Sequence, residues 1–323
     1  MMLDKIQFKY LVLAICIAVI ASLPLYADNY VIRVAISMTM FSAMALSWNF
    51  IGGFTGYPSF ATAAFFGIGC YVGALVQRAG MPAPAAWALA TLFVAAFAAF
   101  LGLIILRLKG HYFAIGSIAI VELTRLIISS WESVTGGGDG LNVPLMQGLP
   151  TEVASRVLYT MLLIALLVFV VSVLVDKARL GFGLRCINQN EDAADMVGVN
   201  TTQFKILAFT LSALFCGTVG AVYASWVGYI DPTDSFSILL TVKVPVMVLL
   251  GGAGTLLGPI VGAAGFVLME EFFWASFLEW NRAALGILIV FLIFFLPHGL
   301  LKIDYSKIKR HFFKTQLEEN KRN

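Results

Sequence analysis

The chain is built from long, uninterrupted runs of apolar residues, separated by short stretches that contain charges, Gly or Pro. A helix of about 20 apolar residues matches the thickness of the hydrocarbon core of a bilayer. The pattern therefore predicts transmembrane α-helices. It argues against a β-barrel, whose strands alternate apolar and polar positions. Ten apolar segments can be drawn, at residues 10–26, 31–51, 57–77, 84–106, 111–130, 157–175, 204–227, 236–250, 257–279 and 283–300.

Composition supports the same fold class. Of the 323 residues, 60% are hydrophobic and only 12% are charged, whereas a soluble domain carries about 25% charged residues. A protein whose whole surface faces water would need more charged residues than this. We therefore expect an all-α, polytopic membrane protein with a single transmembrane domain over residues 1–323, surrounded by lipid and without a nucleic-acid partner.

The positions of Lys and Arg predict the orientation, because cytoplasmic loops are enriched in both residues. With a cytoplasmic N-terminus and ten spans, four arginines fall outside, Arg33, Arg78, Arg156 and Arg282. Fifteen basic residues fall inside, namely Lys5, Lys9, Arg107, Lys109, Lys177, Arg179, Arg185, Lys205, Lys302, Lys307, Lys309, Arg310, Lys314, Lys321 and Arg322. We expect both termini to be cytoplasmic.

The first segment has a second interpretation as a secretory signal, since Lys5 and Lys9 precede an apolar run that ends near Ala27. We favour a retained helix, because the run is long enough to span. Either interpretation places Asp28 outside the membrane.

Two connections are longer than the others. The outer one, near residues 131–156, contains acidic residues and the sequence GGGDG at 136–140. The inner one, near residues 176–203, is the only long cytoplasmic connection before the tail at about 301–323. Long loops in a chain with few of them often contact a partner. By this placement the outside surface, with the outer part of the spans included, holds nine acidic residues, which favours a docking protein of complementary charge.

A short helix is predicted inside the inner connection. Asn190 is a good N-cap, and Glu191 and Asp192 suit the positive end of a helix dipole. Gly198 can end the helix, and Ala193, Ala194, Met196 and Val197 give it a small apolar face. An amphipathic turn on the lipid surface is the alternative, but anionic headgroups would repel the acidic first turn. We therefore favour a docking helix for a soluble partner.

Known catalytic and nucleotide-binding patterns do not support an enzyme. The glycine-rich stretch at 251–255 lacks the lysine of a P-loop, and HExxH and GxSxG do not occur. The string Gly136-Gly137-Gly138-Asp139 resembles the GxGD of intramembrane aspartyl proteases, but no aspartate lies inside a predicted span to face it. The four cysteines lack metal-binding spacing and are interpreted as packing residues. We expect no metal site and no cofactor in this chain.

Charges inside predicted spans each cost roughly 2.5–3.5 kcal/mol on insertion scales, so each needs a reason. Glu122 and Arg125 are three residues apart on one helix and can pair; they either fix helix packing or line a pathway. Lys243 has no local partner. Together with Pro245 in the shortest segment, it predicts a broken or re-entrant helix that lines the pathway or packs against a neighbour.

Small residues recur at intervals of four, a spacing that lets helix backbones approach closely. We expect helix packing at Gly69, Gly73, Gly254, Gly258 and Gly262.

Several motifs together resemble those of a known family. The pattern of Glu191, Ala193, Ala194 and Gly198 is similar to the EAA-type coupling motif of ABC-importer permeases, although Asp192 separates the glutamate from the alanine pair. Further stretches resemble the LivM family of branched-chain amino acid permeases, and they occur in the expected order at 52–60 (GGFTGYPSF), 65–71 (FFGIGCY), 110–115 (GHYFAI), 228–232 (GYIDP), 251–259 (GGAGTLLGP) and 297–300 (PHGL).

The resemblance implies a multi-pass subunit of an ABC importer in a bacterial inner membrane, which moves leucine, isoleucine and valine inward. It implies as partners a second, related permease, two cytoplasmic ATPases that bind ATP and Mg²⁺, and a periplasmic binding protein. The helix that begins at Glu191 would contact an ATPase. Alternatives are an ABC permease for urea, an amide or a sugar, and an ion-coupled secondary transporter, which would need buried acids as coupling sites.

Overall fold

The computed structural model describes residues 14–276 and Gly286. Its long helices are α2 (Asn29–Trp48), α3 (Thr62–Arg78), α4 (Ala83–Ile105), α5 (His111–Ser130), α7 (Pro150–Lys177), α10 (Thr201–Val227), α12 (Ile238–Gly251) and α13 (Gly258–Ser276). The shorter elements are the helices α6 (Glu132–Thr135), α8 (Arg179–Gln189), α9 (Glu191–Met196) and α11 (Pro232–Ser235), the 3₁₀ turns η1 (Leu23–Leu25) and η3 (Gly137–Asp139), the π-helix η2 (Asn49–Gly53), and the strands β1 (Leu141–Asn142) and β2 (Tyr229–Ile230).

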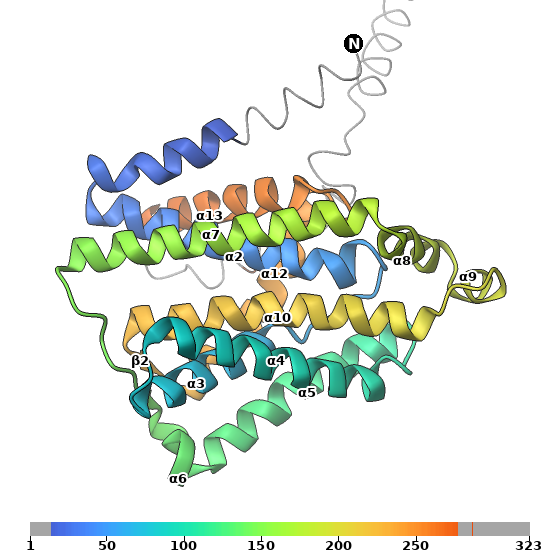
Figure 1. Ribbon diagram of the computed structural model, residues 1–323, viewed down its shortest axis with the longest axis horizontal. Coiled ribbons are helices and arrows are strands. Elements are labelled where there is room, and N and C mark those ends of the chain that lie inside the picture. Colours follow the sequence, from blue (N-terminus) through green and yellow to red (C-terminus); the bar gives the residue numbers. More distant parts are fainter. Residues whose placement is uncertain (1–13, 277–285, 287–323) are drawn as a thin grey trace, which may run out of the picture.

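The long helices form two groups that lie against each other (Figure 1). α2, α7, α12 and α13 lie on one side, and α3, α4, α5 and α10 on the other. α10 connects the groups, because it packs most extensively on α3 and α4 and also contacts α2 and α7. The helices α8 and α9 project at one end of the bundle, whereas β2 and α6 lie at the opposite end. We call these the α8–α9 end and the β1–β2 end.

Glycines allow the backbones of α3 and α10 to touch. A Cβ atom on Gly69 would lie 2.1 Å from the carbonyl oxygen of Gly217, and one on Gly220 would lie 2.1 Å from that of Phe66. Gly73 faces Ala221, whose Cβ would be 2.9 Å away. Gly69 and Gly73 therefore pack two helices, in agreement with their spacing.

Gly258 and Gly262 bring α12 and α13 equally close. A Cβ atom on Gly262 would lie 1.9 Å from the carbonyl oxygen of Met247 and 2.6 Å from the backbone nitrogen of Gly251. The expectation for Gly254 was wrong in one respect. Gly254 lies in the loop between the helices, with a φ of +75° that favours glycine, and not on a helix face.

Within the described residues, each predicted segment from 31–51 to 257–279 overlaps one long helix. Six helical stretches of the described part are long and apolar enough to cross a membrane. The first predicted segment corresponds to a shorter apolar helix, Ala14–Leu25. The predicted segment 283–300, apart from Gly286, and the tail at 301–323 lie outside the described residues.

The expected break at Pro245 is not where the sequence indicated it. α12 runs continuously through Pro245, and the interruption lies between α11 and α12, at Phe236 and Ser237. The missing N–H of Pro245 removes only one backbone bond, to residue 241. Packing of α12 between α2 and α13 keeps the helix intact.

The β1–β2 end is closed by two loops that are tied together. β1 pairs antiparallel with β2, with Leu141 opposite Ile230, and the Tyr229 hydroxyl donates to the carbonyl of Asp139 at 2.8 Å. The GGGD string forms the turn before β1, where Gly136 and Gly137 both have positive φ. It is a structural turn, because only glycine adopts these angles without strain.

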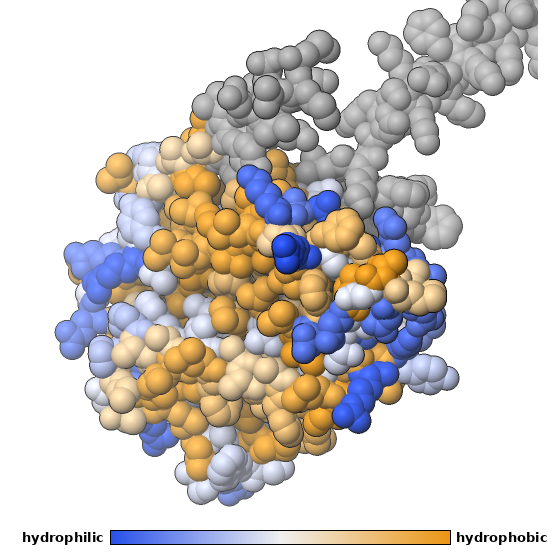
Figure 2. All heavy atoms as spheres, turned by 45° about the vertical axis from the view of Figure 1, so that its right-hand side comes forward, coloured by the Kyte–Doolittle hydropathy of each residue, from blue (hydrophilic) through white to orange (hydrophobic). Residues whose placement is uncertain are grey.

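The surface matches a chain embedded in lipid. Figure 2 shows a broad hydrophobic area flanked on two sides by hydrophilic residues. Exposed apolar side chains are frequent on α4, α5 and α7, and include Phe93, Phe100, Leu123 and Leu163.

Candidate functional site

The short helix predicted in the inner connection is α9, which begins at Glu191. The side chain of its N-cap, Asn190, accepts a hydrogen bond from the backbone N–H of Ala193 at 3.0 Å. Gly198, with a φ of +89°, follows the last turn, and its N–H donates to the carbonyl of Asp195. The helix stands at the end of the bundle, held by the caps that the sequence indicated.

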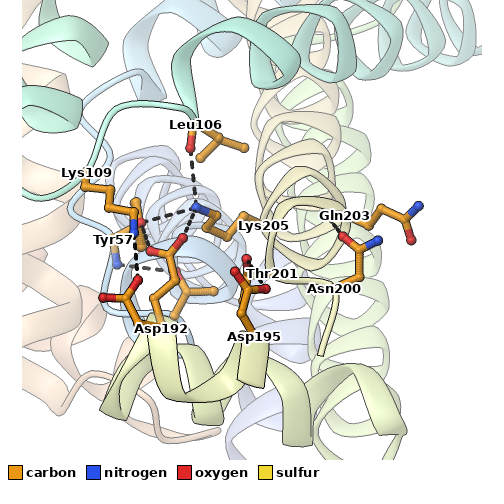
Figure 3. A network of polar contacts seen from close by, with 11 residues as sticks. Tyr57, Leu106, Lys109, Asp192, Asp195, Asn200, Thr201, Gln203 and Lys205 are labelled. Atoms are coloured by element: carbon orange, nitrogen blue, oxygen red, sulfur yellow. Dashed lines mark hydrogen bonds and ion pairs between the residues drawn. The ribbon is translucent and has the colours of Figure 1, made fainter. Parts of the chain in front are cut away.

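Glu191 is largely buried and bonds to Lys205, which points toward Tyr57 and Leu106 in Figure 3. Its carboxylate accepts a hydrogen bond from the Nζ of Lys205 at 2.6 Å and another from the hydroxyl of Tyr57. Lys205 also donates to the carbonyl of Leu106 at 3.3 Å. Its ammonium lies 4.8 Å from the centroid of the Tyr57 ring. Three acceptors from distant parts of the chain, Glu191, Tyr57 and the Leu106 carbonyl, therefore meet at the Lys205 ammonium.

This cluster is shielded from solvent. The Lys205 side chain is only 3% exposed, and that of Glu191 is 15% exposed. Burial raises the pKa of Tyr57 well above its ordinary value, and the hydrogen bond to Glu191 raises it further. Tyr57 is thus held protonated as a donor. A buried ion pair of this kind is strongly destabilised when either partner is removed alone.

Weaker contacts surround the cluster. Asp192 pairs with Lys109 at 2.9 Å on the exposed side of α9, and this contact raises the pKa of Lys109. Asp195 accepts a hydrogen bond from the Thr201 hydroxyl at 3.0 Å. An exposed pair contributes little because solvent screens it, so the buried contacts of Glu191 hold α9 in place.

The outward side of this region is apolar and basic. Met196 is 83% exposed and Val197 75% exposed at the end of α9, and Phe182 is exposed on α8. Beside them lies a groove of about 520 Å³, lined by Lys177, Ala178, Arg179, Phe182, Gly183, Gly198, Val199, Asn200 and Phe204. Exposed apolar side chains gathered around a groove are typical of a protein contact.

One sequence-based expectation is corrected here, and one stays a prediction. The sequence left open which acid of α9 would contact an ATPase; the Glu191 carboxylate is turned inward, where Lys205 and Tyr57 donate to it. Lys205, which was counted among the inner loop residues, is buried in the first turns of α10. The helix α8 was not predicted from the sequence; its Gly181 and Gly183 fit closely against Asp176 and Phe204.

The charged residues inside the helices form pairs. Arg125 donates to Glu122 on the same face of α5, and both side chains stay partly exposed. Lys243 of α12 pairs with Glu270 of α13, with side chains 11% and 16% exposed. Glu270 belongs to the predicted segment 257–279, and it lies inside the helix packing, where it neutralises Lys243. Glu271, the next residue, accepts from the hydroxyl of Tyr30.

The cysteines of the described part are free thiols. Cys70 donates to the carbonyl of Gly220, and Cys216 contacts the hydroxyl of Ser47. Both are buried, as packing residues would be. No group of three or more potential metal ligands occurs among the described residues.

Comparison with known proteins identifies the family. The family model described as a branched-chain amino acid transport system / permease component matches residues 30–293, which include the long helices and α9. The chain belongs to this permease family. It is therefore a transport permease subunit.

Individual relatives agree with this assignment. The chain is 26% identical to the high-affinity branched-chain amino acid transport system permease proteins LivM of Salmonella typhimurium and Escherichia coli, over 95% of this chain and 78% of each relative. It is 24% identical to the fructose import permease protein FrcC of Rhizobium meliloti, over 68% of this chain and 64% of that one. No solved structure matches this permease.

Proposed function

We propose that this permease is the membrane subunit of an ATP-driven importer that moves leucine, isoleucine and valine inward across a bacterial inner membrane. The observation that carries the proposal is the match to two branched-chain amino acid permeases over 95% of the chain. An apolar bundle whose charged groups are paired suits the passage of an apolar side chain, since it offers little that would bind the substrate tightly.

The topology that we propose has ten transmembrane helices, with both termini and the α8–α9 end in the cytoplasm. Lys109, Lys177, Arg179 and Arg185 gather at this end and support the orientation. The first and last predicted helices would bring the eight long helices described above to ten.

ATP and Mg²⁺ would be bound by two partner ATPases and not by this chain. We propose that one ATPase docks on the exposed side of α8 and α9, with Phe182, Met196 and Val197 as its apolar contacts. Lys177 and Arg179 beside the groove would meet acidic groups of the ATPase. Glu191 would act from within, by holding α9 in position.

The second permease would cover the face of α5 that carries Glu122 and Arg125. The pair lies within a helix long enough to span the membrane, yet both side chains are partly exposed. Contact with lipid tails would be energetically costly for such a pair. The pair would therefore face a neighbouring subunit or an aqueous pathway.

A periplasmic binding protein would dock at the β1–β2 end. Glu132, Asp139, Glu152 and Asp234 are exposed there, which gives this end an acidic surface. The pairing of β1 with β2 joins the two loops into one platform.

Another solute is the second candidate. The relatives include the fructose permease and the autoinducer 2 import system permease protein LsrC of Photorhabdus luminescens, which is 28% identical over 45% of this chain and 45% of that one. The bundle therefore suits importers of more than one solute.

The test is reconstitution of this chain with its genomic neighbours in proteoliposomes, with ATP on the ATPase side. We expect uptake of labelled leucine that depends on ATP and on the binding protein. Unlabelled valine and isoleucine should compete with this uptake. ATP-dependent uptake of fructose without leucine uptake would favour the second candidate. Uptake driven by an ion gradient without ATP would contradict both.

A further inference from the structure

The segment from Asn49 to Tyr57 joins the docking helix to the α12–α13 hairpin, and it does so by direct hydrogen bonds at both of its ends. It comprises the π-helix η2 and the following loop, at the α8–α9 end of α2. Two of the glycine-rich motifs singled out in the sequence, at 52–60 and 251–259, meet here.

At its first end the contact is made by Asn49. This side chain is almost fully buried, and its Oδ1 accepts from the backbone N–H of Gly254 at 2.9 Å. Its Nδ2 donates to the carbonyl of Thr255 at 3.0 Å. One amide thus satisfies two successive backbone groups of the α12–α13 loop, a geometry that fixes the loop relative to α2.

Gly53 allows this contact to form. A Cβ atom on Gly53 would lie 1.8 Å from the Oδ1 of Asn49 and 2.7 Å from the backbone nitrogen of Gly254. The backbones of the two glycine-rich motifs therefore touch, with no side chain between them. Such a contact transmits displacement, because tightly packed atoms cannot be compressed.

At its other end the segment holds α8 and α9. Tyr57 donates to Glu191 of α9, and Asn188 of α8 donates to the carbonyls of Gly53 and Phe54 at 3.2 and 3.3 Å. The Tyr57 ring also packs edge-on against Phe113, with centroids 5.3 Å apart. Movement of α9 must therefore displace the segment or break these bonds.

The hairpin on the far side behaves as one unit. α12 and α13 touch through Gly251, Gly258 and Gly262, and the ion pair of Lys243 with Glu270 joins them further along. A shift of the loop at Gly254 would move both helices together. The hairpin also packs on α2.

We propose that residues 49–57 form a link that carries movement of the ATPase-docking helix α9 to the α12–α13 hairpin, with Asn49 and Tyr57 as positioning residues. The proposal rests on the proposed function for the role of α9 as the docking site. The link itself consists of contacts within this chain.

The first test measures coupling in the full importer in nanodiscs and proteoliposomes. Asn49→Ala and Tyr57→Phe are expected to lower the number of leucine molecules moved per ATP hydrolysed roughly threefold or more, while the ATPases still co-purify with the permease. Tyr112→Phe and Asn29→Ala are matched controls, since Tyr112 and Asn29 are exposed and lie outside the proposed link. A role limited to stability would reduce the yield of protein and leave this ratio unchanged.

The second test measures amide hydrogen exchange in the same nanodiscs. Tyr57→Phe is expected to raise exchange at residues 191–198 and also at 252–257, because the link connects them. Asn49→Asp, which keeps the acceptor for Gly254 and loses the donor to Thr255, is expected to raise exchange at 252–257 even if Asn49→Ala does not fold. Exchange changes confined to 191–198 in Tyr57→Phe, together with an unchanged coupling ratio, would overturn the proposal.

Failure of the proposed function has a different signature. In that case the wild-type importer would show no ATP-driven leucine uptake at all. The exchange experiment would still report whether residues 49–57 connect α9 to the hairpin.

Discussion

Lys243 of α12 and Glu270 of α13 neutralise each other inside the helix bundle, 27 residues apart in the chain. The ammonium and the carboxylate are each almost enclosed. Inside an apolar bundle each charge depends on the other, since desolvation of an unpaired ion costs several kcal/mol.

Removing one partner is therefore expected to be worse than removing both. Glu270→Leu should destabilise the protein by about 3–5 kcal/mol, whereas Glu270→Leu combined with Lys243→Met should recover most of the loss. The measurement is thermal unfolding in detergent: each variant is heated, and the fraction of protein that stays monodisperse is compared with that of the wild type. Asp234→Leu, at an exposed acid, is the control and should change little. Equal losses in the single and double variants would contradict a mutual neutralisation.

The seam between α3 and α10 predicts a contrast between two glycines. Gly69→Ala places a methyl group 2.1 Å from a backbone oxygen of α10, so the helices must separate, at a cost of about 1–3 kcal/mol or more. Gly265→Ala on α13 meets nothing within 4 Å and should be neutral or slightly stabilising, because alanine favours helix. The melting temperatures of the two variants test this prediction. Similar melting temperatures would contradict a close contact between α3 and α10 at Gly69.

Two neighbouring acids of α9 should respond differently to charge reversal. Glu191→Arg puts a second cation beside the buried Lys205, and α9 is expected to detach and become sensitive to trypsin. Asp192→Arg loses only the exposed pair with Lys109, which solvent screens, and should keep α9 protected. Limited proteolysis of the purified chain compares the two. Equal protection in both variants would show that Glu191 does not anchor the helix.

The docking surface can be tested with exposed apolar residues alone. Met196→Asp or Val197→Asp should weaken co-purification of the ATPases by about tenfold or more, since a charge would replace an apolar contact in the interface. Leu145→Asp is the matched control, because Leu145 is equally exposed near the opposite end of the bundle. Loss of the ATPases in the control as well would indicate general misfolding.

Variants of the Glu122–Arg125 pair on α5 can distinguish a structural role of the pair from a role in transport. If Glu122 and Arg125 only neutralise each other, Glu122→Ala should impair membrane insertion, and the added change Arg125→Ala should partly restore it. If they line a pathway, the single and double variants should insert normally and transport equally poorly. Quantification of the inserted protein and of leucine uptake distinguishes these outcomes.

Apolar periodicity in the sequence predicted most of the bundle, because each long run has to be helical to satisfy its backbone in lipid. The N-cap of α9 could also be predicted from the sequence, because Asn190 lies directly before the acidic first turn of the helix. The spacing of Gly69 and Gly73 predicted a close helix contact, which the structure locates against Gly217 and Ala221.

Contacts between distant segments could not be read from local pattern. Nothing near Glu191 in the chain shows that Tyr57, 134 residues earlier, would donate a hydrogen bond to its carboxylate. Nothing near Lys243 identifies Glu270, which lies 27 residues later on another helix. The pattern around Asn49 does not indicate its role either, since an asparagine at a helix end usually suggests only a cap or turn.

The inward orientation of Glu191 has an evolutionary consequence. Its partners are positions 57 and 205 of the same chain, so replacements at position 191 among relatives should be accompanied by replacements at these two positions. They should not track the surface of the partner ATPase. A glutamate in a docking-helix motif would then be inherited together with its own permease, even where the ATPase is exchanged for another.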